Sequence, residues 1–66
     1  MKIILNGQEK ELAPPVKLNK VVEQFCQDCR PVIAEVNGRI VKSQAWNETT
    51  LSSGDTVELV NFVGGG

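Results

Sequence analysis

The residues of this chain best suited to chemistry are its last three, Gly64, Gly65 and Gly66, which we expect to end in a free carboxylate. They directly follow a strand-like run over residues 56–63. Glycine has no Cβ, so it reaches nearly any backbone conformation and lets another backbone approach closely. A Gly-Gly carboxyl can therefore thread a narrow channel and present an unshielded carbonyl to an attacking group. The alternative is a frayed terminus, which most domains have.

Cys26 and Cys29 form a C-x-x-C pair, the other motif with chemical potential. A redox pair gains its low-pKa thiolate at a helix N-terminus, whereas this pair falls near the end of a helical pattern, where the dipole disfavours an anion. A zinc site needs four ligands, and the chain has no His and only two Cys, so only a dimer could complete one. A disulfide is disfavoured in a reducing compartment. The favoured interpretation is packing on a helix, since unpaired Cys behaves as a small hydrophobe.

Length and charge exclude several functional classes. A chain of 66 residues is expected to form one domain, residues 1–66, with no room for a second core. Seven Lys/Arg against eight Asp/Glu give a net charge of −1 without a basic run, so we expect no nucleic acid partner. No apolar stretch approaches the length of a membrane span, and polar residues interrupt the N-terminus too soon for a signal peptide. We therefore expect a cytoplasmic protein without a membrane partner.

Two strands are predicted before Pro14-Pro15. Residues 1–6 alternate with the period of a strand, and Asn6-Gly7 is a strong signal for a two-residue hairpin turn. A second strand over about residues 8–13 would return antiparallel to the first. The two prolines then end the pairing, because proline has no N–H to donate and restricts its predecessor to extended geometry.

A helix is predicted from Leu18 onward, where the period of the apolar residues changes. One apolar stripe recurs at i, i+3, i+4, i+7 and i+11, formed by Leu18, Val21, Val22, Phe25 and Cys29. Asn19 is a possible N-cap, and a start one or two residues earlier fits equally well. Pro31 bounds the far end.

The second half is predicted to hold three further strands. Residues 32–36 and 39–41 flank Asn37-Gly38, another hairpin signal. Ser43 is expected to cap a short helical turn that places Trp46 over one edge of the core. After a turn at residues 53–55, the last strand is expected over about residues 56–62.

This order of elements predicts an α+β fold, a mixed sheet of four to five strands with one main helix packed across it. The first and last strands could lie side by side and parallel at the centre, so that residues 64–66 project from the sheet as a flexible tail. Strand parity then places Ile4, Val60 and Phe62 together on the open face. Apolar patches of this kind often mark interfaces, although scattered exposed apolar residues are also normal. We therefore predict a partner-binding patch beside the root of the tail.

Several motifs together carry a family resemblance. Residues 34–41 read Ala-Glu-Val-Asn-Gly-Arg-Ile-Val, Trp46 and Gly54-Asp55 follow, and residues 61–66 read Asn-Phe-Val-Gly-Gly-Gly. With the strand pattern around them, these residues resemble the ThiS family of sulfur carrier proteins in thiamine biosynthesis. The resemblance covers essentially the whole chain and implies the ubiquitin-like β-grasp fold. The C-x-x-C pair and Pro14-Pro15 depart from the pattern, and neither touches the tail.

The resemblance implies a covalent carrier that enzymes load and unload, and not an enzyme. An E1-like adenylating enzyme would use ATP to adenylate the carboxylate of Gly66, and a sulfur donor such as a cysteine desulfurase would supply the sulfur of a thiocarboxylate. Thiazole synthase would then take that sulfur for the thiazole ring of thiamine. Gly64 and Gly65 would thread the end group into the partner sites. The chain has no His and no phosphate-binding glycine loop, so we expect it to hold no cofactor or metal of its own.

Three alternatives stay open from the residues alone. The same carrier chemistry could serve molybdopterin synthesis or another sulfur-requiring pathway, because a closing Gly-Gly would also suit the small subunit of molybdopterin synthase. A non-covalent ubiquitin-like binding module would tolerate deletion of Gly66. A C-x-x-C redox protein would survive that deletion and fail with Cys26→Ser.

Overall fold

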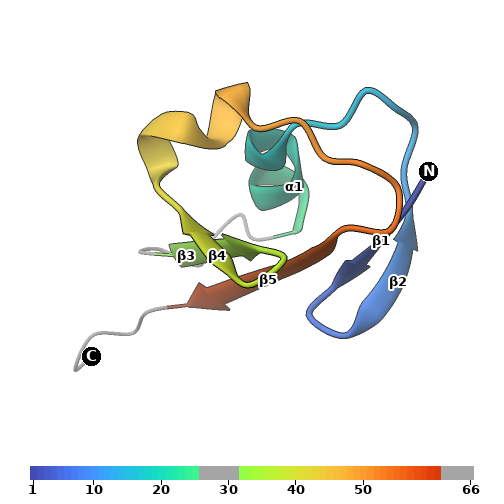
Figure 1. Cartoon of the computed structure of the whole chain (residues 1–66), viewed down its shortest axis with the longest axis horizontal. Helices are drawn as coiled ribbons and strands as arrows, with labels where there is room; N and C mark the ends of the chain where they lie inside the picture. Colours follow the sequence, from blue (N-terminus) through green and yellow to red (C-terminus); the bar gives the residue numbers. More distant parts are fainter. Residues whose placement is uncertain (26–31, 62–66) are drawn as a thin grey trace.

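The computed structural model describes residues 1–25 and 32–61 of the chain. In chain order the elements are β1 (Lys2–Leu5), β2 (Gln8–Glu11), α1 (Leu18–Phe25), β3 (Val32–Val36), β4 (Arg39–Val41), the 3₁₀ helix η1 (Ser43–Glu48) and β5 (Thr56–Asn61). The five strands of this described part form one sheet in the order β2-β1-β5-β3-β4. The helix α1 lies across one face of the sheet, and η1 lies on the same side (Figure 1). The predicted α+β architecture is therefore confirmed.

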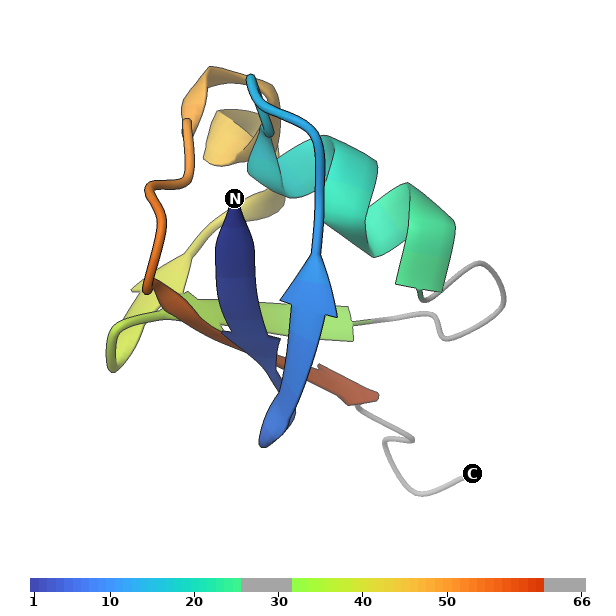
Figure 2. The same ribbon diagram turned by 90° about the vertical axis from the view of Figure 1, so that its right-hand side faces the viewer.

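The centre of the sheet is the parallel pair of β1 and β5, as predicted. Ile4 pairs with Thr56, and Leu5 pairs with Val57. On its other edge β5 is antiparallel to β3, so the sheet is mixed. Figure 2 shows the consequence of this order, since the two hairpins β1–β2 and β3–β4 lie on either side of β5.

Both Asn-Gly pairs form the predicted hairpin turns. The φ angles are 50° at Asn6, 81° at Gly7, 53° at Asn37 and 83° at Gly38. A type I′ turn requires positive φ at both central positions, and Asn followed by Gly adopts them at least cost. The strand β2 ends at Glu11, earlier than the predicted residue 13, because Glu11 pairs with Lys2 at the start of β1. One further backbone bond, from the Leu12 N–H to the Met1 carbonyl at 2.7 Å, closes the hairpin.

The helix α1 begins at Leu18, so the earlier of the predicted starts is correct and Asn19 is not the N-cap. The start is fixed by backbone bonds to the loop after η1. The Leu18 N–H donates to the Thr49 carbonyl at 2.9 Å, and the Leu51 N–H donates to the Val16 carbonyl at 2.8 Å. The buried Oδ1 of Asn19 has no hydrogen-bond partner within the described part of the chain. Cys26, Cys29 and Pro31 lie outside the described residues.

The helical turn after β4 is a 3₁₀ helix, and it differs from the prediction at its start. Its N-cap residue is Lys42, which makes no side-chain capping bond, so Ser43 is the first helical residue and not the cap. Trp46 packs against the core as predicted. Its indole Nε1–H donates to the Val41 carbonyl at 2.8 Å, which ties η1 to the end of β4.

The core lies between the sheet and α1 and is wholly apolar among the described residues. Its buried members are Ile3, Leu5, Val16, Leu18, Val21, Val22, Ala34, Leu51, Val57 and Leu59. The alternation along β1 and β5 follows the predicted parity, since Ile3, Leu5, Val57 and Leu59 all point toward the helix. This parity leaves the opposite face of the sheet, called here the outer face, for the remaining strand residues.

Candidate functional site

The strand β5 carries the chain toward its C-terminus and extends beyond its parallel neighbour. The strand β1 ends at Leu5, opposite Val57, whereas β5 continues beside β3 as far as Asn61, which pairs with Val32. In Figures 1 and 2 the end of β5 extends past the β1–β2 hairpin. The last described residues of the central strand are therefore paired with β3 alone, beyond the end of β1.

Two turn asparagines fix β5 in place with their side chains. The Oδ1 of Asn6 accepts a hydrogen bond from the Leu59 N–H at 2.9 Å, at a point where β1 has already ended. The Oδ1 of Asn37 accepts from the Thr56 N–H at 2.9 Å, and its Nδ2 donates to Asp55 Oδ1 at 3.1 Å. Each turn thus bonds to the strand that bears the tail, and sequence reasoning missed this role of the two residues.

The outer face of the sheet carries the described members of the predicted partner patch. Ile4 and Val60 both point to this face, because Ile4 pairs with Thr56 and Val60 follows Thr56 at even spacing. Ile4 is half-buried, while Val60 is 46% exposed. Glu58 lies between Thr56 and Val60 on the same face, so Ile4 and Val60 do not touch as one continuous apolar area.

The neighbours of Val60 on this face come from the β3–β4 hairpin. Ile33 pairs directly with Val60, and Ile40 pairs with Glu35, the next outward residue of β3. Ile33 is 36% and Ile40 is 68% exposed. With Val60, these are the large hydrophobic residues exposed in the described part of the chain. The alternation of residues along β3 predicts that Ile33 points to the outer face. The outward direction of Ile40 follows only from the register in which β4 pairs with β3.

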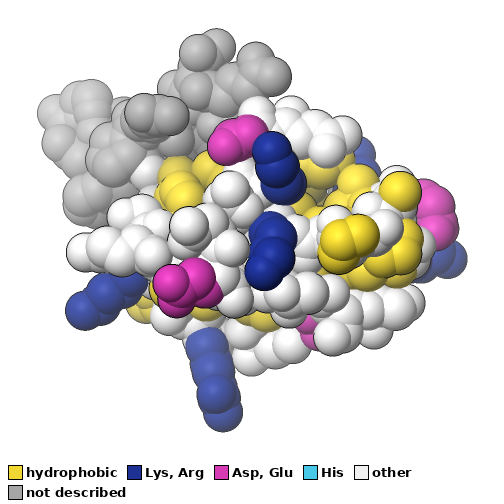
Figure 3. Space-filling model, turned by 90° about the horizontal axis from the view of Figure 1, so that it is seen from above, with side chains coloured by type: hydrophobic (Ala, Val, Ile, Leu, Met, Phe, Trp, Pro, Cys, Tyr) yellow, Lys and Arg dark blue, Asp and Glu magenta, His cyan; other side chains and the backbone are white. Residues whose placement is uncertain are grey.

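The described residues bear an exposed apolar surface, and two kinds of site feature are absent from them. No polar or charged residue among them is buried, and no three His, Cys, Asp or Glu side chains among them gather as metal ligands. The side with α1 and η1 shows basic and acidic side chains interspersed with apolar ones and no field of one sign (Figure 3). No helix in residues 1–25 or 32–61 is long and apolar enough to cross a membrane.

The other predicted site residues lie outside the described residues. These are Phe62 of the patch and the tail glycines Gly64, Gly65 and Gly66. The roles predicted for them therefore stay predictions, as does the packing predicted for Cys26 and Cys29.

Comparison with known sequences places the chain among thiamine-biosynthesis proteins. The profile of the ThiS family matches residues 3–66. A thiazole synthase of Paramagnetospirillum magneticum is 30% identical over 66 residues, which are all of this chain and 20% of that protein. The chain thus spans about a fifth of the length of that relative. An uncharacterized protein, ycf40, of Trieres chinensis is 29% identical over 62 residues, 94% of this chain and 85% of that protein.

Solved structures agree with the sequence comparison. The crystal structure of the thiamine biosynthesis protein ThiS from Geobacter metallireducens superposes with a TM-score of 0.85 at 28% identity and covers 100% of both chains. A solution structure of a thiamine biosynthesis protein from the same organism gives a TM-score of 0.78 at 28% identity, with 100% of this chain and 88% of that chain covered. The predicted β-grasp fold is confirmed by this likeness.

Proposed function

The chain belongs to the ThiS family of thiamine-biosynthesis sulfur carriers, and we propose that it carries its sulfur as a thiocarboxylate on Gly66. The observation that carries the proposal is the family match, which extends through the last residue of the closing Gly64-Gly65-Gly66. The geometry of β5 supports it, because the central strand of the sheet ends at Asn61, shortly before that run in the sequence.

The chemistry follows from the state of a terminal carboxyl group. Its pKa is about 3.3–3.7, so at neutral pH it is an anion and a poor electrophile. In the proposed first step, a carboxylate oxygen of Gly66 attacks the α-phosphorus of ATP, and pyrophosphate leaves. The sulfur of a persulfide then attacks the acyl carbon and expels AMP. A thiol then attacks the donor's sulfur in the resulting acyl disulfide and forms a new disulfide with it, and the displaced thiocarboxylate stays on Gly66.

The chain acts in this scheme as a cosubstrate of other proteins. Members of this family are small carrier proteins and not catalysts. Adenylation is therefore assigned to an E1-like enzyme that uses ATP, sulfur supply to a donor such as a cysteine desulfurase, and sulfur uptake to thiazole synthase. The similarity of this chain to part of a thiazole synthase supports the last assignment.

Residues 63–66 are long enough to carry the Gly66 carboxylate into the active site of a partner enzyme. Residues 63–66, when extended, span at most about 13–14 Å. That reach brings the carboxylate of Gly66 into a recessed partner site while the sheet stays outside, and Gly64 and Gly65 present no side chain to the walls of the channel.

A deletion variant separates the carrier from the other classes of protein. We expect the chain without Gly66 to fold normally and to form no thiocarboxylate in the presence of ATP, the adenylating enzyme and the sulfur donor. Cys26→Ser should form the thiocarboxylate at the wild-type rate. Intact-protein mass spectrometry reads both results, and the spectrum of the untreated chain also shows whether it ends at Gly66. Normal sulfur loading of the deletion variant would refute the proposed attachment site.

The patch of Ile4, Val60 and Phe62 is proposed to contact the adenylating enzyme. Val60→Asp places a charge in the exposed part of this patch and should weaken binding at least about fivefold, as expected for a central interface residue. Ala13→Asp is the matched control, because Ala13 is also exposed and lies on the loop between β2 and α1. Isothermal titration calorimetry with the adenylating enzyme measures both affinities. Equal affinities for Val60→Asp and wild type would remove the patch from the interface.

A further inference from the structure

The outer face holds two glutamates directly opposite each other. Glu35 on β3 pairs with Glu58 on β5. Residues paired in this way have Cβ atoms about 4.5–5.5 Å apart, and like charges at that separation destabilise the sheet. The pair thus lies on the central strand β5 and on its neighbour β3.

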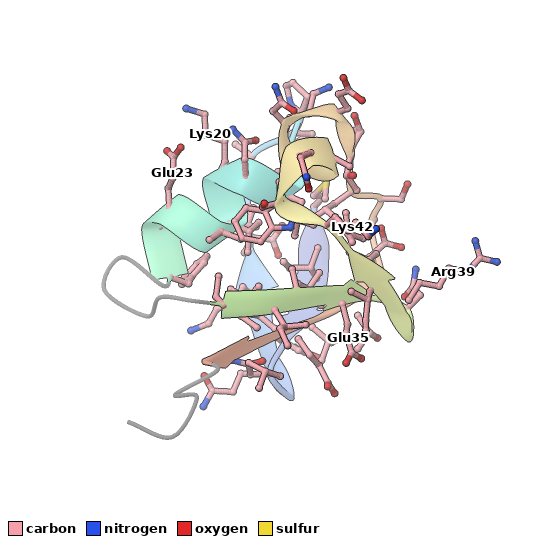
Figure 4. All side chains as sticks on the ribbon, turned by 90° about the vertical axis from the view of Figure 1, so that its left-hand side faces the viewer. Lys20, Glu23, Glu35, Arg39 and Lys42 are labelled. Carbon is pink, nitrogen blue, oxygen red and sulfur yellow. The ribbon has the colours of Figure 1, made fainter. Side chains whose placement is uncertain are left out.

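These two carboxylates differ from the other glutamates of the outer face. Glu9 forms an ion pair with Lys2 at 3.4 Å, and Glu11 forms one with the Met1 amino group at 3.0 Å. Within residues 1–25 and 32–61, neither Glu35 nor Glu58 has a cation within ion-pair distance. Figure 4 shows that Arg39 extends away from the tip of the β3–β4 hairpin and that Lys42 lies on the other side of the sheet from Glu35.

Apolar side chains border the pair. Ile40 stands beside Glu35 in the same row across the sheet, and Ile33 pairs with Val60 in the next row. The side chains of Ile33, Ile40 and Val60 are all exposed. The docking face is defined here as Ile33, Glu35, Ile40, Glu58 and Val60. An interface on it would enclose two negative charges behind an apolar border, which is where an ion pair gains strength from the exclusion of water.

We propose that the docking face binds the adenylating enzyme through an apolar surface that carries one arginine, whose guanidinium lies between Glu35 and Glu58. Arginine fits better than lysine, because its planar guanidinium presents five N–H donors and is more weakly hydrated than an ammonium group. One such group can reach two carboxylates that are held on neighbouring strands. The inference rests on the proposed function, which supplies the partner.

Stability and affinity respond in opposite directions to the same substitutions. Glu35→Gln and Glu58→Gln remove the like-charge repulsion, so the free chain should unfold at a higher temperature than wild type. The complex should weaken, because each substitution removes a charged acceptor from the arginine. Glutamates that only keep the surface hydrated would give the higher unfolding temperature without the loss of affinity.

The test measures the affinity of full-length variants for the purified adenylating enzyme by isothermal titration calorimetry. Each single substitution should weaken binding about tenfold, as expected for a lost charge-assisted hydrogen bond. The double variant should lose less than the product of the two single effects, since one guanidinium serves both carboxylates. Glu23→Gln is the matched control, because it makes the same charge change on α1, on the opposite side of the sheet (Figure 4). It should change the affinity by less than about twofold.

Three results would overturn the inference. One is wild-type affinity of the Glu35→Gln/Glu58→Gln double variant, and another is an equal loss in Glu23→Gln, which would indicate a general effect of net charge. The third is a loss of affinity for thiazole synthase with none for the adenylating enzyme. Formation of the acyl adenylate by the wild-type chain separates these from a failure of the proposed function. If no adenylate forms, the proposed function fails and the inference fails with it; if it forms, only the inference is at stake.

Discussion

Asn37 joins two parts of the chain that are distant in sequence. Its backbone turns the β3–β4 hairpin, its N–H donates to the Thr56 carbonyl at 2.7 Å, and its Oδ1 accepts from the Thr56 N–H at 2.9 Å. The residue therefore anchors the start of β5 as well as shaping a turn. Asn6 does the same farther along β5 through Leu59.

Asn37→Gly isolates the contribution of the side chain. Glycine accepts the φ of 53° found at this position, so the turn should persist while the bonds to Thr56 and Asp55 are lost. We expect the free energy of unfolding to fall by about 1 kcal/mol, the net value of such hydrogen bonds. Urea denaturation followed by circular dichroism measures the change. A midpoint equal to that of wild type would show that the side-chain bonds contribute nothing.

The two asparagines also show the limit of sequence reasoning at this scale. The Asn-Gly pairs predicted both turns correctly, because the signal lies in the local φ preference. Their bonds to β5 could not be predicted, since they depend on which strand lies beside each turn. The same holds for Glu35 and Glu58, whose opposition follows from the register between β3 and β5.

At the scale of elements, α1 shows how tertiary contacts replace a cap. The pairing of Lys17 with Thr50 and the flanking backbone bonds of Leu18 and Leu51 fix where the helix begins. Asn19 lies inside the helix, with its Oδ1 buried and without a partner among the described residues.

Because of this arrangement, Asn19→Ala is not expected to destabilise the protein, unlike the loss of an N-cap residue. Loss of a true N-cap would destabilise the protein by about 1 kcal/mol. Here alanine removes an unsatisfied buried oxygen and has the higher helix propensity, so stability should stay unchanged or rise by up to about 1 kcal/mol. Thermal unfolding of the variant beside wild type gives the answer. A clear fall in the unfolding temperature would mean that the Asn19 side chain has a stabilising partner after all.

Element types were predictable from the sequence, as were the bounds of β3 and β4 and the start of α1, whereas the end of β2 and the cap of η1 were not. The change of apolar period at Leu18 predicted α1, and alternation predicted β1 and β5, because burial on one face imposes these periods. These two features depend on contacts with other parts of the chain. The strand β2 ends at Glu11, which pairs with Lys2 at the start of β1. The helix η1 begins at Ser43, and its N-cap residue Lys42 makes no side-chain capping bond.

At the scale of the whole molecule, a small apolar core has to support the exposed outer face. A protein of this size has a free energy of unfolding of about 3–10 kcal/mol. Leu18 is fully buried at 0% exposure, so Leu18→Ala should lower that free energy by about 2–5 kcal/mol. Ile40→Ala, at 68% exposure, should change it by less than about 0.5 kcal/mol. Parallel urea titrations compare the two, and equal losses would contradict the division between core and docking face.

The arrangement of the strands in the sheet was predictable in part, from evidence other than the local patterns that predicted each element. Strand parity and the family resemblance together indicated a central parallel pair with the tail beyond it, and the sheet order confirms the pair. The composition of the docking face needed the hairpin register, which joins Ile40 to Glu35. The predicted patch therefore included Val60 and omitted its neighbours Ile33 and Ile40.

The most direct measurement for the central claim is the intact mass of the wild-type chain after incubation with ATP, the adenylating enzyme and the sulfur donor. Fragmentation of the same sample locates any change along the chain. We predict a mass increase equal to the exchange of one oxygen for one sulfur, confined to Gly66. An unchanged mass under conditions in which the enzyme loads a known ThiS protein, or a sulfur found on Cys26 or Cys29 instead, would contradict a thiocarboxylate carrier.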